Sequence, residues 1–188
     1  MASSPRVALI TIGTELILGR VPNTNAGWLA QRVVQVGGHV SRVTTVRDHP
    51  EDIVASIAEA IRGKATHIIT TGGLGPTPDD LTVATVAGML VCPVVEDAGL
   101  LTHFRRKLGL GEGEPLSSSM RKVATIPEKG SAGPNPSGWG HCIEVSHAGV
   151  ILFILPGPPG EVEALFPIYI EPALRVVIGP ARGRSKRS

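Results

Sequence analysis

A short apolar segment that runs directly into a glycine turn sets the strongest limit on how this chain can fold. The segment reads IITTGGLGPTPDDLT over residues 68–82. Its first residues are apolar or β-branched, which is typical of a buried parallel strand. Gly72, Gly73 and Gly75 follow at once, and glycine allows the backbone to adopt a positive φ or to approach a ligand closely. The sequence therefore predicts a strand that ends in a glycine turn.

A helix is predicted directly after this turn. The apolar segment LTVATVAGML follows Asp79 and Asp80, and aspartate is a favoured helix N-cap. A strand, a glycine turn and a helix N-terminus together present free backbone N–H groups to an anion. The segment contains neither a P-loop lysine nor the GxGxxG spacing. Because two carboxylates repel a phosphate unless a divalent cation lies between them, we interpret the segment as a phosphate and metal site. The alternative is a tight turn in which Asp79 or Asp80 only caps the helix.

The first ninety residues alternate between strand and helix patterns. Strands are predicted at 6–12, 39–46 and 67–71, and helices at about 23–36, about 51–62 and after residue 80. This alternation predicts an α/β fold with a parallel sheet and helices on both faces. Ligands bind such sheets beyond the carboxyl ends of the strands. The segments that follow the three strands are therefore expected to meet at one edge.

The remainder of the chain is less regular. We interpret residues 92–140 as a small excursion from the main sheet, with helices at about 97–108 and 117–124 and a loop at 131–140. Two strands are predicted at 141–146 and 150–155, joined by a turn at 147–149. A final helix is predicted at about 159–174. Pro167 and Pro172 are expected to break or kink the final helix. One domain is expected over residues 1–178, followed by a disordered basic tail over 179–188.

The composition and the residue pattern exclude several classes of function. No apolar run approaches the roughly 20 residues that span a bilayer, and no signal-peptide pattern is present, so the cytoplasm is expected. Three Phe, one Tyr and two Trp are too few for a base-stacking platform, which argues against nucleic acid. The dispersed histidines argue against zinc, and Ser117–Ser119 is interpreted as a helix start. Cys92 and Cys142 are interpreted as buried small hydrophobes rather than a metal site, and a disulfide between them is the open alternative.

Three carboxylates are candidates for chemistry at the predicted edge. Glu15, Asp48 and Asp80 follow three different predicted strands. Asp48 and Asp80 are predicted to hold Mg²⁺ or another divalent cation, and Glu15 to position a water for phosphoanhydride hydrolysis. An open alternative is that Asp48 caps the next helix. Neutral polar residues near the edge are candidates for ligand contacts or for caps and turn bonds; these are Asn23, Asn25, Thr71 and Thr77.

The motif TTGGLGPTPDDLT resembles the molybdopterin-binding domain family of MogA and MoaB, and is closer still to the N-terminal domain of competence/damage-inducible protein A (CinA). Four further segments support the resemblance: IGTELILGRVPNTNAGWLA (12–30), TTVRDHPEDI (44–53), NPSG (135–138) and LPGPPGEVEALF (155–166). The resemblance implies a three-layer α/β sandwich with a mostly parallel central sheet. It also implies a homo-oligomer, either a trimer or a dimer.

The resemblance further implies a binding site for a small phosphorylated ligand, a pterin or a nucleotide. The positions that match the family's site are Asp48, Gly72, Gly73, Gly75, Asp80, Pro156 and Gly157. MogA-like relatives handle molybdopterin, its adenylate and Mg²⁺, whereas CinA-like relatives are associated with metal-dependent cleavage of ADP-ribose-type pyrophosphates. The corresponding expectations are an enzyme acting at a pyrophosphate bond, or a carrier that binds molybdopterin or a nucleotide without turnover. An assembly subunit is the third and least supported alternative.

The sequence departs from this family's pattern in three places. NPSGWGHCIEV replaces the usual Gly-Thr-Ala-Pro-Gly-type stretch, so the contacts near Trp139 and His141 are expected to differ. Pro78 stands at a position that is usually acidic. The chain stops before the C-terminal amidohydrolase domain of full-length CinA, so deamidation of nicotinamide mononucleotide is not expected.

Overall fold

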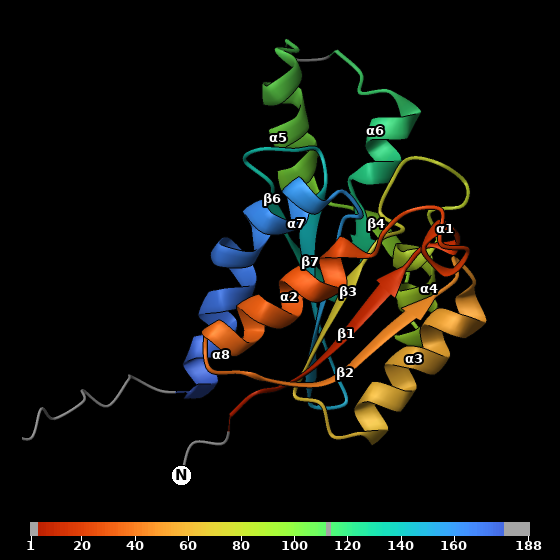
Figure 1. Cartoon of the computed structure of the whole chain (residues 1–188). Coiled ribbons are helices and arrows are strands. Elements are labelled where there is room, and N and C mark those ends of the chain that lie inside the picture. The colour runs from red at the N-terminus through yellow and green to blue at the C-terminus, as the bar shows by residue number, and fades with distance from the viewer. Residues whose placement is uncertain (1–3, 112–113, 179–188) are drawn as a thin grey trace, which may run out of the picture.

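The sheet that organises the protein has six strands in the order β2-β1-β3-β8-β7-β6 (Figure 1). The computed structural model describes residues 4–111 and 114–178, so the predicted tail at 179–188 lies outside the described residues. Strands β2, β1, β3 and β8 are parallel, and β7 and β6 are antiparallel to their neighbours. The six strands are β1 (Arg6–Ile12), β2 (His39–Val46), β3 (His67–Thr71), β6 (Gly130–Pro134), β7 (His141–His147) and β8 (Val150–Leu155).

Helices cover both faces of this sheet. Alternate side chains of β1 point into two separate cores, with Val7 and Leu9 in one and Ala8 and Ile10 in the other. One core is completed by α2 (Thr24–Gln35), α7 (Pro159–Leu165) and α8 (Glu171–Ile178). The other is completed by α3 (Pro50–Arg62), α4 (Thr82–Met89) and α5 (Ala98–Leu108). The predicted α/β sandwich with a mostly parallel sheet is therefore confirmed.

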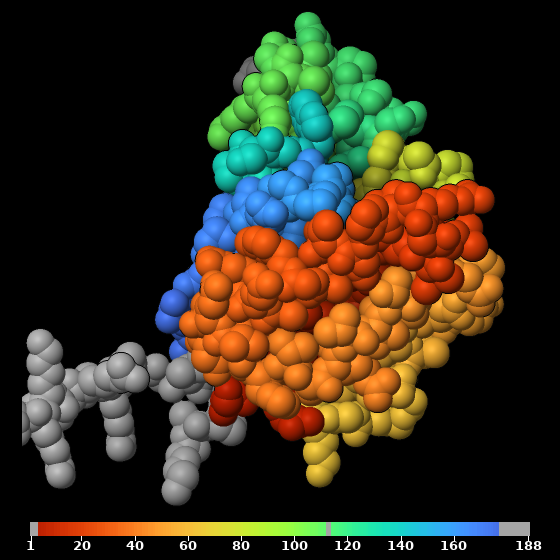
Figure 2. All heavy atoms as spheres, viewed as in Figure 1, coloured from red at the N-terminus to blue at the C-terminus, as the bar shows by residue number. Residues whose placement is uncertain are grey.

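The excursion projects from one end of the sheet, as the green segments in Figures 1 and 2 show. It contains α5, α6 (Ser118–Val123) and a two-stranded sheet of β4 (Val94–Glu96) and β5 (Thr125–Pro127). The helix start predicted at Ser117 is confirmed, since its side chain accepts a hydrogen bond from the Met120 amide (3.2 Å).

The loop predicted at 131–140 is wrong in its first part. Residues Gly130–Pro134 form β6, which pairs with β7 at the edge of the main sheet. The sequence GSAGP has low intrinsic strand propensity, so this strand exists because β7 offers it a hydrogen-bonding partner. The segment that connects β1 to α2 contains the one-turn helix α1 (Thr14–Ile17).

The last helix is interrupted at Pro167, as predicted, whereas Pro172 lies in the first turn of α8 (Glu171–Ile178) and does not break it. A π-helical segment, Phe166–Ile170, separates α7 from α8 and contains Pro167. Proline has no N–H to donate, so the regular α-helical ladder cannot continue through it. The predicted turn between β7 and β8 is also confirmed. Its central residues, Ala148 and Gly149, both have positive φ (50° and 77°), as a two-residue hairpin turn requires.

No helix within the described segments combines the length and the apolar character that crossing a bilayer requires.

Candidate functional site

An open cleft of about 810 Å³ lies at the carboxyl ends of the parallel strands. Its lining includes all three predicted catalytic carboxylates, the predicted glycine turn, and a second glycine turn that follows β8. These residues are Glu15, Asp48 and Asp80; Gly72, Gly73 and Gly75; and Pro156 and Gly157. They converge because β1, β2 and β3 are in parallel register, with Ile12 beside Val46 and Thr11 beside Thr71. The segments that leave these strands therefore enter the same space.

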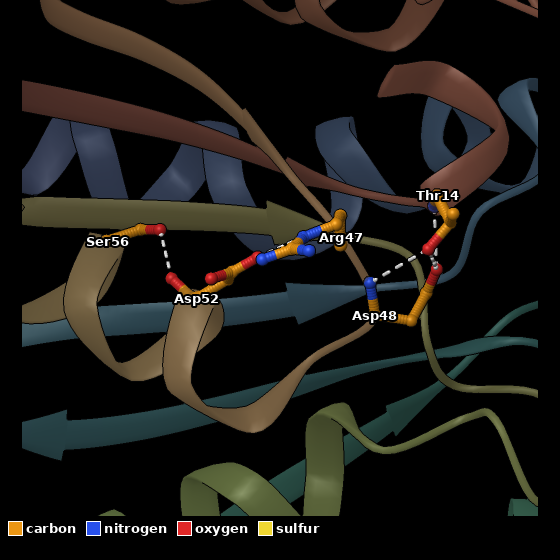
Figure 3. Close-up of polar contacts among 5 residues, drawn as sticks. All are labelled: Thr14, Arg47, Asp48, Asp52 and Ser56. Atoms are coloured by element: carbon orange, nitrogen blue, oxygen red, sulfur yellow. Dashed lines mark hydrogen bonds and ion pairs between the residues drawn. The ribbon is translucent and has the colours of Figure 1, made fainter. Parts of the chain in front are cut away.

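Asp48 links the end of β2 to the end of β1 (Figure 3). Its Oδ2 accepts hydrogen bonds from the Thr14 amide (2.7 Å) and the Thr14 hydroxyl (3.0 Å). The N-cap of α3 is His49, and no side chain caps that helix. Asp48 therefore holds two loops together at the cleft, and the alternative that it caps α3 is wrong.

Arg47, the neighbour of Asp48 in the sequence, binds a carboxylate outside the cleft. Its guanidinium donates to the Asp52 carboxylate at 2.8 Å (Figure 3), which lowers the pKa of Asp52. The Ser56 hydroxyl donates to the Asp52 carbonyl oxygen (2.6 Å). Arg47 does not line the cleft.

Asp80 is anchored in the same manner as Asp48. Its Oδ2 accepts from the Thr77 amide (2.9 Å) and the Thr77 hydroxyl (2.6 Å). The predicted aspartate N-cap of α4 is wrong, because Leu81 occupies that position and no side chain caps the helix. Neither Asp48 nor Asp80 has a hydrogen bond to its Oδ1 from any described residue. Each carboxylate thus has one anchored oxygen and one available oxygen.

The glycine turn leaves backbone donors without partners. The Gly72 amide donates to the Leu155 carbonyl (3.0 Å), but the amides of Gly73, Leu74 and Gly75 donate to no group in the described part of the chain. Three adjacent backbone donors without partners beside a cleft are suited to bind an anion, because buried N–H groups are almost always paired. Gly72 and Gly73 have φ of 106° and 71°, values that favour glycine.

The charge around the cleft is strongly negative. Five carboxylates line it against the single guanidinium of Arg20; the five are Glu15, Asp48, Asp79, Asp80 and Glu161. A phosphate would be repelled by this lining unless a cation accompanied it. Within residues 4–111 and 114–178, no three His, Cys, Asp or Glu side chains come close enough to hold a metal ion by themselves. Mg²⁺ commonly uses one or two carboxylates together with ligand phosphates and water, and the donor set fits that mode.

The four neutral candidates lie beside the cleft or serve its carboxylates. Thr71, Asn23 and Asn25 line an adjoining cavity of about 270 Å³, which shares Glu15 and Gly157 with the main cleft. The Asn25 amide donates to the Gly157 carbonyl (2.8 Å) and so joins α2 to the second glycine turn.

Asn23 has a full set of internal partners. It caps α2 by accepting from the Ala26 amide (3.2 Å), and its amide donates to the hydroxyls of Thr11 (2.7 Å) and Thr45 (3.0 Å). This geometry favours the cap alternative for Asn23 over a ligand contact.

Replacing Asn23 with alanine is expected to lower the free energy of unfolding by about 2 kcal/mol, since both a helix cap and two hydroxyl partners are lost. Urea denaturation followed by circular dichroism measures this loss. The control is Asn25→Ala, which removes one hydrogen bond and is expected to cost about 0.5 kcal/mol. Equal losses in the two variants would contradict the structural role of Asn23.

Two residues that the sequence did not single out as ligand contacts complete the site. Glu161 and Trp139 line the cleft, and the Glu161 carboxylate accepts from the amides of Trp139 (2.8 Å) and Gly140 (3.2 Å). The signal for Glu161 was its place in the LPGPPGE segment, directly after the second glycine turn.

His141 is buried and lies outside the cleft. Only 1% of its surface is exposed, and neither ring nitrogen has a hydrogen-bond partner among the described residues. Burial lowers its pKa to about 4 from 6.5, partly opposed by the charge of Asp97. Burial also lowers the pKa of His67.

The neutral imidazole of His141 makes the fold sensitive to acid. Between pH 6.5 and pH 4 the His141 imidazole binds a proton in the unfolded chain but stays neutral in the folded protein. The free energy of unfolding therefore falls as pH drops from 6.5 towards 4. We expect His141 to account for about 3 kcal/mol of this loss. Urea midpoints measured between pH 7 and pH 4 test this, and His141→Leu should flatten the profile. An unchanged profile in that variant would contradict it.

Comparison with known proteins agrees with the resemblance drawn from the sequence. The family described as "Probable molybdopterin binding domain" matches residues 8–176. A protein from Pyrobaculum calidifontis is 41% identical over 91% of this chain and 64% of its own length. A CinA-like protein from a Synechococcus species is 37% identical over 90% of this chain and 40% of its own length. The chain thus spans less than two thirds of these relatives.

A solved structure agrees as well. CinA from Thermoplasma acidophilum superposes with a TM-score of 0.79 at 28% identity, covering 93% of this chain and all of that one. The expected resemblance to the CinA N-terminal domain is confirmed.

Proposed function

The chain belongs to the molybdopterin-binding domain family that includes CinA-like proteins, and on this premise we propose that its cleft cleaves a pyrophosphate bond with the help of a divalent cation. The proposed substrate is ADP-ribose-like or an adenylated pterin. The cleavage adds water across the phosphoanhydride, so ADP-ribose would yield AMP and ribose 5-phosphate.

One observation carries this proposal: residues with unpaired backbone amides and residues with anchored carboxylates line a single cleft. The amides of Gly73, Leu74 and Gly75 support binding of phosphate oxygens and of the charge that develops on them in the transition state. Five carboxylates in the same lining argue against a site for an anion alone, because they would weaken phosphate binding in the absence of a cation.

Asp48 and Asp80 are the residues proposed to hold the cation, in each case through the oxygen that their threonine partner does not occupy. A divalent cation, when bound, offsets the repulsion between carboxylate and phosphate and polarises the phosphoryl group. Glu15 is exposed and its carboxylate has no hydrogen-bond partner in the described residues, so it is available to orient a water and accept its proton.

A second candidate is a carrier that binds molybdopterin or a nucleotide without turnover. The lack of a three-ligand group among the described residues favours it, since a protein-only metal site is not preformed. Homo-oligomerisation as a dimer or trimer stays a prediction that light scattering can check.

A turnover assay separates the two candidates. The full chain is incubated with ADP-ribose, FAD or adenylated molybdopterin, with Mg²⁺, Mn²⁺ or excess chelator, and products are resolved by chromatography. The enzyme proposal expects AMP to form only when a divalent cation is present. Binding of a ligand by calorimetry with no product under any condition would contradict the enzyme and support the carrier.

A further inference from the structure

Trp139 is the only Trp, Tyr or Phe side chain that lines the cleft in the described part of the chain. It lies in the connection between β6 and β7, in the stretch where this sequence departs from its family. Figure 1 shows that connection at the end of the sheet that carries α5 and α7. Asp48 and Asp80 line the same cleft, so a ligand held by them extends into space that the indole borders.

The backbone around Trp139 is held in place by buried and charged partners. Glu161 of α7 accepts from the amides of Trp139 and Gly140. Asn135, which is only 1% exposed, donates to the Glu161 carbonyl (3.3 Å) and accepts from the Ser137 amide (2.9 Å). The connection therefore has a defined conformation rather than that of a free loop.

The indole ring is fixed from the side of α5. The Lys107 ammonium lies 4.8 Å from its ring centroid and also donates to the Gly138 carbonyl. The Phe104 ring lies 5.9 Å away, centroid to centroid. A cation over an aromatic face is attracted by the ring quadrupole, so Lys107 helps to hold the indole in place.

These partners leave Trp139 partly exposed. Trp139 is 39% exposed, although it packs on a buried phenylalanine. The cleft of about 810 Å³ lies in the range that holds a whole drug-sized ligand. A pyrophosphate group alone would leave most of that volume empty.

We propose that Trp139 stacks on the planar heterocycle of the phosphorylated ligand, so that the cleft selects phosphates that carry a ring over phosphates that do not. This proposal rests on the proposed function, because it assumes that the phosphate lies at the glycine turn. The ring is an adenine or a pterin, and both present the same flat face to an indole.

A purely structural role for Trp139 would require a different kind of side chain than stacking on a ligand does. Shielding Phe104 requires only a large apolar group, which leucine supplies. Stacking requires an aromatic face, which phenylalanine supplies in part and leucine does not. Trp139→Leu and Trp139→Phe therefore separate the two roles, and circular dichroism verifies that both variants fold.

The experiment compares two ligands that differ only in the base. Dissociation constants of AMP and ribose 5-phosphate are measured by calorimetry with Mg²⁺ for the wild-type chain, the two Trp139 variants and Trp28→Phe. Trp28 packs on Phe166 outside the cleft and serves as the matched control. We expect Trp139→Leu to weaken AMP binding by about tenfold and leave ribose 5-phosphate unchanged. Trp139→Phe is expected to retain most of the affinity, and Trp28→Phe all of it.

A second measurement needs no change at Trp139. In Trp28→Phe, Trp139 is the remaining tryptophan, so its fluorescence reports on the cleft. AMP is expected to quench it and ribose 5-phosphate is not. Neopterin monophosphate in the same titration distinguishes a pterin from an adenine site by relative affinity.

Three results would overturn the inference. The first is that Trp139→Leu leaves the affinity for AMP unchanged. The second is that the wild-type chain binds AMP and ribose 5-phosphate with equal affinity. Either result would reject stacking and leave the proposed function standing. Failure of ADP-ribose, AMP and the pterin phosphate all to bind would reject both.

Discussion

Replacing Asp80 with asparagine is expected to lower kcat/KM for ADP-ribose by about 100-fold or more and to leave the fold intact. The Asp80 Oδ2 bonds to Thr77 survive in the variant, because the asparagine carbonyl accepts the same two donors. The NH2 group of the asparagine then takes the place of the available Asp80 Oδ1. This group carries hydrogen-bond donors and cannot bind a cation as the carboxylate oxygen would. Product formation under saturating Mg²⁺ measures the loss.

Asp79→Asn is the matched control for this prediction. It removes the same charge from the same cleft, but Asp79 is exposed and its side chain accepts no hydrogen bond from a described residue. We expect its kcat/KM to fall only a few-fold, through the general field of the cleft. Wild-type activity in Asp80→Asn, or equal losses in the two variants, would reject Asp80 as a metal ligand and catalytic residue.

The part of the site that the sequence predicted is the part set by parallel-sheet geometry. Three strands in register deliver the segments after them to one edge, so Glu15, Asp48 and Asp80 were expected together and line one cleft. This inference needs only the order of strands and helices. The fold followed for the same reason, since β-branched runs and helical periodicity identify most of the elements.

The rest depended on partners that are distant in sequence. The Asp80 carboxylate accepts a hydrogen bond from Thr77 and does not cap the helix after it. Nothing in the sequence DDLT predicts this partner. Strand β6 forms because β7 pairs with it. The cleft position of Trp139 depends on Glu161, 22 residues further along. Contacts of this kind have no local pattern, so propensity and spacing cannot predict them.

The glycine turn itself provides the second large expected effect. Gly72→Ala should lower the free energy of unfolding by about 3 kcal/mol or more, because two costs add. The residue has φ of 106°, which alanine rarely adopts, and a Cβ there would lie 2.2 Å from the Ile12 carbonyl oxygen. That oxygen belongs to the last residue of β1, an interior strand of the sheet, so it cannot move aside without disturbing the sheet.

Gly157→Ala separates this effect from a general intolerance of side chains in the cleft. A Cβ at Gly157 would meet only the Gly72 Cα, at 3.8 Å, which is ordinary van der Waals contact. We expect a change within about 0.5 kcal/mol by urea denaturation. If Gly72→Ala were as stable as Gly157→Ala, the turn would have to rearrange freely, and free amides of Gly73, Leu74 and Gly75 would no longer be a preformed anion site. Equal and large losses would instead mean that the second turn is as tightly confined as the first.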